Sequence, residues 1–209
     1  LAREGLRGPG VVITGNTVVD ALLWASRQKQ SRRGPSGTRD VLVTLHRRES
    51  FGKPLRGIFR ALISLVRLHE DLVLIYPLHP NPRVRSSALR LLRHPRIHLI
   101  KPLPYLDFIR LMKNAAFVIT DSGGLQEEAA CLGKPLLVVR KATERPEIID
   151  SGAGKLVGLS RKNLIHWASR LLIDKALRRR MSRSRQLYGD GKASERIASV
   201  IARWKPRLK

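Results

Sequence analysis

The chain has 209 residues, of which 43% are hydrophobic, and its 41 lysines and arginines against 16 aspartates and glutamates give a formal net charge of +25. This hydrophobic share can bury a sizeable core and excludes a disordered tail, and no apolar run approaches the roughly 20 residues that a membrane-spanning helix needs. With no signal-peptide pattern, we predict a cytoplasmic protein without a membrane partner. The single cysteine, Cys131, cannot form an internal disulfide and is expected in the core.

Short β-rich apolar runs alternate with longer helical patterns along the chain. We expect strands at Val11–Thr14, Asp40–Leu45, Leu72–Tyr76, Ile97–Ile100, Phe117–Thr120 and Leu136–Val139, separated by helices at Thr17–Arg27, Pro54–His69, Arg83–Arg93, Tyr105–Asn114 and Gly124–Leu132. After Gly158 the pattern is helical, at Arg161–Ile173, Asp174–Arg183 and Ala193–Trp204. This alternation predicts an α/β fold of Rossmann-like βαβ units, with a parallel sheet flanked by helices and further helices at the C-terminal end.

The expected division of the chain falls at residue 38. Residues 1–38 are predicted to form a linker that contains the first strand and helix and a flexible basic loop at 28–38, where Gly, Ser and Pro are mixed with Arg. Residues 39–209 are predicted to form one Rossmann-like domain that binds a ligand.

The segment 121–128, Asp-Ser-Gly-Gly-Leu-Gln-Glu-Glu, follows the apolar run 115–120 and opens a predicted helix. Free backbone N–H groups at a helix start, left uncovered by Gly123 and Gly124, form a site for a phosphate or another anion. One turn further on, Glu127 and Glu128 could reach hydroxyl groups beside that anion. This combination suits a nucleotide-sugar, although Asp-Ser-Gly before a helix is also an ordinary N-terminal cap.

Three further polar clusters follow predicted strands, at 44–49, 76–82 and 140–146. Ligands bind at the carboxyl ends of strands in open parallel sheets, so these clusters are expected to meet the 121–128 turn in space.

The large positive charge raises the question of nucleic-acid binding. The basic residues are spread over 27–33, 83–96, 178–185 and 203–209, and only 5% of residues are aromatic, so a base-stacking surface is not evident. We therefore regard nucleic acid as an unlikely partner. The charge is either a solvated face or an offset for acidity in a missing segment.

Seven motifs in order resemble the non-hydrolysing UDP-N-acetylglucosamine 2-epimerases. They are Thr-Gly-Asn-Thr-Val-Val-Asp-Ala-Leu (14–22), His-Arg-Arg-Glu-Ser-Phe-Gly (46–52), Tyr-Pro-Leu-His-Pro-Asn-Pro (76–82), Asp-Ser-Gly-Gly-Leu-Gln-Glu-Glu (121–128), Gly-Lys-Pro (133–135), Thr-Glu-Arg-Pro-Glu (143–147) and Gly-Asp-Gly-Lys-Ala (189–193). The resemblance implies a GT-B fold, of which this chain looks like the C-terminal half, the N-terminal half being absent. It also implies a homodimer for the full-length protein, and UDP-GlcNAc or UDP as the ligand.

Residue roles are implied by the same resemblance. Ser122, Gly123 and Gly124 would hold the diphosphate, Glu128 the ribose hydroxyls, and His79 and Arg145 would be catalytic. Arg47 would add positive potential beside the phosphates. The loop 102–105, which ends in Tyr105, resembles one that cradles uracil. His46, Tyr105, Glu127 and Glu144 are further candidates for the site.

The family reaction removes the C2 proton, eliminates UDP to give 2-acetamidoglucal, and adds UDP back with the proton on the opposite face, giving UDP-ManNAc. It needs no nicotinamide or metal, and no His or Cys spacing here indicates a metal site. Its acid and base carboxylates belong to the N-terminal half, so we expect this chain to bind UDP weakly and to be inactive alone. Alternatives are a GT-B glycosyltransferase, a hydrolysing 2-epimerase, or a non-catalytic sugar-nucleotide-binding module.

Some of these assignments have a structural alternative. His46 could be a helix or loop cap, and Glu127 could simply pair with a nearby arginine. Two departures from the family pattern are Lys141-Ala142, where an Asp-Thr pair is usual, and Ala130, where proline is frequent.

Overall fold

The computed structural model describes residues 5, 8, 10–28, 38–183 and 187–204. A single six-stranded sheet lies at its centre, and every pair of neighbouring strands is parallel. The strands are β1 (Arg39–Thr44), β2 (Leu72–Pro77), β3 (Ile97–Ile100), β4 (Phe117–Thr120), β5 (Leu136–Val138) and β6 (Gly154–Leu156), in the spatial order β3-β2-β1-β4-β5-β6. The strand order reverses between β1 and β4, which makes this junction the switch point of a doubly wound sheet.

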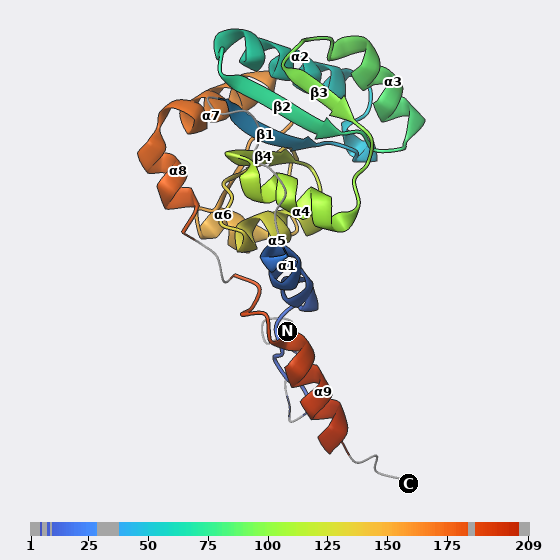
Figure 1. Cartoon of the computed structure of the whole chain (residues 1–209), viewed down its shortest axis with the longest axis vertical. Helices are drawn as coiled ribbons and strands as arrows, with labels where there is room; N and C mark the ends of the chain where they lie inside the picture. The colour runs from blue at the N-terminus through green and yellow to red at the C-terminus, as the bar shows by residue number, and fades with distance from the viewer. Residues whose placement is uncertain (1–4, 6–7, 9, 29–37, 184–186, 205–209) are drawn as a thin grey trace.

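Helices cover both faces of the sheet (Figure 1). One layer contains α2 (Lys53–Leu68), α3 (Pro82–Leu91), α7 (Arg161–Ile173) and α8 (Lys175–Met181), and the other contains α1 (Thr17–Arg27), α4 (Tyr105–Asn114), α5 (Gly123–Cys131) and α6 (Pro146–Asp150). The final helix, α9 (Ala193–Arg203), contacts α1 and points away from the sheet (Figure 1). The α/β fold with a parallel sheet predicted from the sequence is confirmed.

Successive side chains of a strand point to opposite faces of the sheet, and this alternation divides the core into two clusters. Val41 and Val43 of β1 pack into the cluster beneath α2 and α7, while Leu42 between them packs beneath α1 and α4. All three side chains are fully buried because both faces of the sheet are covered. The amphipathic period of α2 supplies Ile58 and Leu62 to the first cluster.

The strand predicted at Val11–Thr14 is wrong. Residues 11–16 have no regular secondary structure, and Ile13 is 87% exposed. An isolated apolar run has no neighbour with which to form ladder hydrogen bonds, so its β propensity is not realised. The 28–38 loop predicted to be flexible falls mostly on residues 29–37, which lie outside the described residues.

Three short elements were not predicted from the sequence: β6, α6 and a 3₁₀ turn, η2, at Arg48–Ser50. The apolar content of each is too small to give a periodic signal. Gly154 starts β6 at a point where a Cβ would lie 2.6 Å from Cγ2 of Ile148, so α6 can pack against this strand only because the position has no side chain.

Candidate functional site

The site lies at the carboxyl ends of β1 and β4, where the strand order reverses. β1 runs into Leu45, His46 and Arg47, and β4 runs into Asp121 and the glycine turn that begins α5. The Thr44 and Thr120 hydroxyls, which end the two strands, hydrogen-bond to each other at 2.7 Å. The two segments that the sequence singled out therefore meet at one point of the sheet edge.

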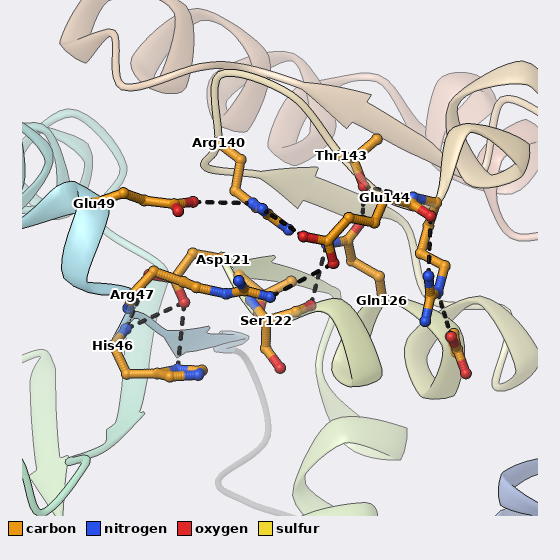
Figure 2. Close-up of polar contacts among 12 residues, drawn as sticks. His46, Arg47, Glu49, Asp121, Ser122, Gln126, Arg140, Thr143 and Glu144 are labelled. Atoms are coloured by element: carbon orange, nitrogen blue, oxygen red, sulfur yellow. Dashed lines mark hydrogen bonds and ion pairs between the residues drawn. The ribbon is translucent and has the colours of Figure 1, made fainter.

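Asp121 organises the turn after β1. Its carboxylate is completely buried and accepts hydrogen bonds from the backbone N–H groups of His46 (2.9 and 3.1 Å) and Arg47 (2.9 Å), while Nδ1 of His46 lies 3.3 Å away (Figure 2). Burial raises the pKa of Asp121 and lowers the pKa of His46. The side chain that caps this turn is thus Asp121, so the alternative that His46 is the loop cap is wrong.

The start of α5 has the features of an anion site. Ser122 is the N-cap residue but its side chain makes no capping bond, and its N–H donates to the Thr120 hydroxyl at 3.0 Å. Gly123 opens the helix, and a Cβ on it would meet Nη2 of Arg47 at 3.6 Å and Oε2 of Glu144 at 3.7 Å. Amide groups at this helix start and a guanidinium therefore face the same space.

A chain of charges extends from this point to β5. Glu144 accepts from Nη2 of Arg140 at 3.1 Å and lies 3.9 Å from Arg47, and Nε of Arg140 donates to Glu49 at 3.2 Å (Figure 2). Arg140 is only 8% exposed, and these ionic hydrogen bonds, above all with Glu144, raise the pKa of Arg140 despite its burial. The sequence analysis included Arg140 in the polar cluster 140–146 but gave it no role of its own, although its place directly after the apolar run 136–139 was a usable signal.

The two glutamates of α5 have different partners. Glu128 is 7% exposed and accepts from the Tyr105 hydroxyl at 3.0 Å, and burial raises the pKa of Glu128. Glu127 accepts from Nε of Arg145 and, at 2.7 Å, from the side-chain amide of Asn16. The ion pair suggested as the structural alternative for Glu127 is therefore present, and it also fastens Arg145 and the start of α1 to α5.

His79 reaches the site from β2. Its ring stacks on His46 with 5.0 Å between centroids and 12° between planes, and its Nδ1 accepts the backbone N–H of Asn81 at 3.1 Å. Beside the two rings lies a cavity of about 210 Å³. Its lining comes from the ends of β1 and β2, the loop after β3, and the helices α4 and α5. The lining residues are Thr44, Leu45, His46, Pro77, Leu78, His79, Pro80, Pro102, Leu103, Phe108 and Leu125.

The predicted site residues thus converge with one division among them. Two of them, Glu127 and Arg145, lie on the side of α5 that faces Asn16. A larger group gathers around the ends of β1 and β4, namely His46, Arg47, His79, Ser122, Gly123, Gly124 and Glu144. Among the described residues, no group of three or more His, Cys, Asp or Glu side chains is arranged to hold a metal ion.

The fold is a doubly wound Rossmann-like domain, and the candidate site lies at its switch point. The sequence model of the family described as UDP-N-acetylglucosamine 2-epimerase matches residues 1–202, and the chain belongs to this family. The resemblance found in the sequence is confirmed.

Relatives and solved structures agree with this assignment. A probable UDP-N-acetylglucosamine 2-epimerase from Ralstonia nicotianae is 47% identical over 96% of this chain and 57% of its own length, and the Escherichia coli K12 UDP-N-acetylglucosamine 2-epimerase is 42% identical with the same coverage. The structure of Staphylococcus aureus MnaA with UDP superposes with a TM-score of 0.87 at 40% identity, over 96% of this chain and 56% of that one.

The Neisseria meningitidis UDP-GlcNAc 2-epimerase bound to UDP-GlcNAc also gives a TM-score of 0.87, at 34% identity, over 97% of this chain and 58% of that one. The glycosyltransferase WaaG is 19% identical with a TM-score of 0.59, which shows a shared fold alone. The chain spans between 56% and 58% of the length of these epimerase relatives.

Proposed function

We propose that the chain is the UDP-binding part of an epimerase that interconverts UDP-GlcNAc and UDP-ManNAc by elimination and re-addition of UDP. The observation that carries the proposal is the start of α5 at the switch point, where free amide groups face Arg47 and Gly123 has no side chain in the way. A diphosphate fits this position because helix-start amides and a guanidinium both prefer anionic oxygens.

The remaining parts of the nucleotide have matching surroundings. The cavity beside Pro102 and Leu103 is apolar enough to take a flat base, and we assign Glu128 of α5, which accepts a hydrogen bond from Tyr105, to the ribose hydroxyls. The stacked imidazoles of His46 and His79 border the same cavity. Accordingly we assign Ser122, Gly123, Gly124 and Arg47 to the diphosphate.

Elimination puts negative charge on the diphosphate oxygen as the C1–O bond breaks. Donors already aimed at that oxygen stabilise this charge more in the transition state than in the substrate, so the α5 amides and Arg47 would contribute to catalysis as well as to binding. His79 and Arg145 are the proposed catalytic residues of this chain. Arg145 donates to Glu127 through Nε and to the Glu144 carbonyl through Nη1, so these bonds fix the orientation of its guanidinium.

The test is calorimetric titration of the chain with UDP and UDP-GlcNAc, joined to an NMR titration that follows the Gly123 and Gly124 amides. We expect weak binding with shifts at both glycines. A folded chain that binds neither ligand would overturn the proposal.

Activity separates the remaining alternatives. We expect the chain alone to produce no UDP-ManNAc, and a longer protein that includes the rest of the family's length to produce it reversibly. Free ManNAc as the product would indicate the hydrolysing reaction, and transfer only with an acceptor would indicate a glycosyltransferase. The homodimer and the cytoplasmic location stay predictions.

A further inference from the structure

The positive charge of the molecule is concentrated in one of its two helical layers. The helices of the first layer carry four Lys or Arg residues on α2, three on α3, three on α7 and four on α8, and no Asp or Glu lies within these helices. In the opposite layer, α1, α4, α5 and α6 together carry three Lys or Arg and six Asp or Glu. The site described above uses none of the charges on α2, α3, α7 or α8.

A basic groove lies at one end of this layer. It encloses about 640 Å³ and is lined by Ala116, Lys175, Arg178, Arg179, Ser182 and Arg183. Arg178 is committed to the fold because its guanidinium donates to the carbonyls of Leu171 and Leu172. Lys175 and Arg179 are exposed and turn their charge towards solvent.

Two aliphatic side chains protrude beside these charges. Leu68 ends α2 and is 63% exposed, and Ile173 ends α7 and is 72% exposed. A 2.8 Å hydrogen bond between His69 and Ser169 holds the ends of the two helices together. Exposed aliphatic residues among cations are typical of surfaces that insert shallowly into a lipid headgroup layer.

These protrusions lie at the opposite edge of the sheet from the candidate site. Arg39, the first residue of β1, donates to the Leu172 carbonyl, so the end of α7 lies at the amino edge of the sheet. The candidate site lies at the carboxyl edge. Contact through Leu68 and Ile173 would therefore leave the site open to solvent.

We propose that the face formed by α2, α7 and α8 binds reversibly to a membrane rich in anionic phospholipids. Each basic side chain near such a surface contributes about 1 kcal/mol of attraction, roughly fivefold in partitioning, and Leu68 and Ile173 add apolar burial. Single-stranded nucleic acid is disfavoured because none of the large hydrophobic side chains exposed on the helices of this layer is aromatic; they are Leu68 on α2, Leu89 on α3 and Ile173 on α7. This differs from the expectation of no membrane partner made from composition. A peripheral surface needs no spanning helix, and among the described residues no helix is long and apolar enough to span a bilayer.

The test is co-sedimentation of the whole chain with vesicles of 70% phosphatidylcholine and 30% phosphatidylglycerol, and with vesicles of phosphatidylcholine alone. We expect binding to the anionic vesicles only, weakened strongly between 50 and 500 mM salt, values chosen to span the Debye length from about 14 to about 4 Å. Equal binding to both vesicle types, or none to either, would overturn the proposal.

Matched variants locate the surface. Arg179→Gln with Arg180→Gln, two exposed positions of α8, should weaken binding by about 25-fold, whereas Arg27→Gln with Arg203→Gln, which removes the same charge elsewhere, should change it by less than about twofold. Leu68→Ser with Ile173→Ser should weaken binding and make it more sensitive to salt. Equal losses from both charge pairs would show an effect of net charge alone and would refute the assigned face. If a 20-nucleotide single strand displaced the chain from anionic vesicles, the preferred ligand of this face would be nucleic acid and the lipid proposal would be refuted.

Discussion

Oε2 of Glu144 lies 3.9 Å from Nη2 of Arg47, and both atoms stand over Gly123, at the position where a diphosphate would approach the start of α5. The hydrogen bond from Arg140 is the main cause that lowers the pKa of Glu144, so this carboxylate is charged at neutral pH. An internal anion thus pairs with Arg47, and under the proposed function the diphosphate would have to displace it.

Glu144→Gln is therefore expected to tighten UDP binding by up to about fivefold, since it removes a charge that repels the phosphates, and solvent screening at this exposed side chain limits the effect. Calorimetry with UDP measures the effect. Uridine, which has no phosphate, should bind equally to both proteins. The control is Glu49→Gln, which removes the other carboxylate on Arg140 and should change UDP affinity by less than about twofold. Weaker UDP binding by Glu144→Gln would instead indicate that Glu144 contacts the ligand directly.

Gly123→Val should abolish measurable UDP binding while the chain stays folded. The Cβ position meets Arg47 and Glu144 atoms only at 3.6 and 3.7 Å, which is ordinary contact, so the fold tolerates a side chain that the phosphate does not. Gly57→Val on α2 is the control, because a Cβ there has nothing within 4 Å and lies in the other layer. Thermal unfolding should show midpoints within a few degrees of each other. UDP affinity unchanged in the Gly123 variant would remove the α5 start from the site.

Glu128→Gln is expected to weaken binding of UDP and uridine by about tenfold and leave pyrophosphate binding unchanged, because the carboxylate is assigned to the ribose. The same variant tests the pH dependence of stability. Burial raises the pKa of Glu128 above its ordinary 4.5, so the folded state holds the proton more tightly than the unfolded state does.

The direction of the pH effect on stability follows from this difference between the folded and unfolded pKa of Glu128. As pH rises from about 4.5 through the folded pKa, wild-type stability falls because a buried carboxyl becomes charged, and Gln at this position does not ionise. The variant should therefore gain stability relative to wild type at neutral pH, and the gap should shrink below about pH 4.5. Thermal midpoints measured from pH 4 to 7 test this, and a gap that widens towards acid would contradict it.

Glu127→Ala should destabilise the chain by about 1 to 3 kcal/mol, because the side chain is buried and bonds both Asn16 and Arg145. Asn16 caps α1, so hydrogen exchange should accelerate in α1 before it does in the β1 and β4 strands. Glu147→Ala, an exposed change in the neighbouring helix α6, is the control and should cost less than about 0.5 kcal/mol. If hydrogen exchange in α1 of the variant equalled that of wild type, the bond between Glu127 and Asn16 would not stabilise α1.

The sequence by itself determined the parallel α/β fold, because long amphipathic helices and apolar strands repeat with distinct periods that survive in any tertiary context. It also located the strand, glycine turn and helix start at Ser122, Gly123 and Gly124, because this arrangement is a matter of local backbone geometry between β4 and α5. The strand predicted at Val11–Thr14 is wrong because a strand needs a neighbouring strand to pair with, and the local sequence does not show whether one is there.

Only the tertiary structure decided which charges meet. Asp121 contacts residues 74 and 75 positions away, Glu127 contacts Asn16 at a separation of 111, and Arg140 reaches Glu49 across 91 residues. No local pattern encodes such pairs, because their distances are set by the order of strands in the sheet. The same holds for the separation of charge between the two helical layers, which emerges only when α2, α3, α7 and α8 are folded onto one face.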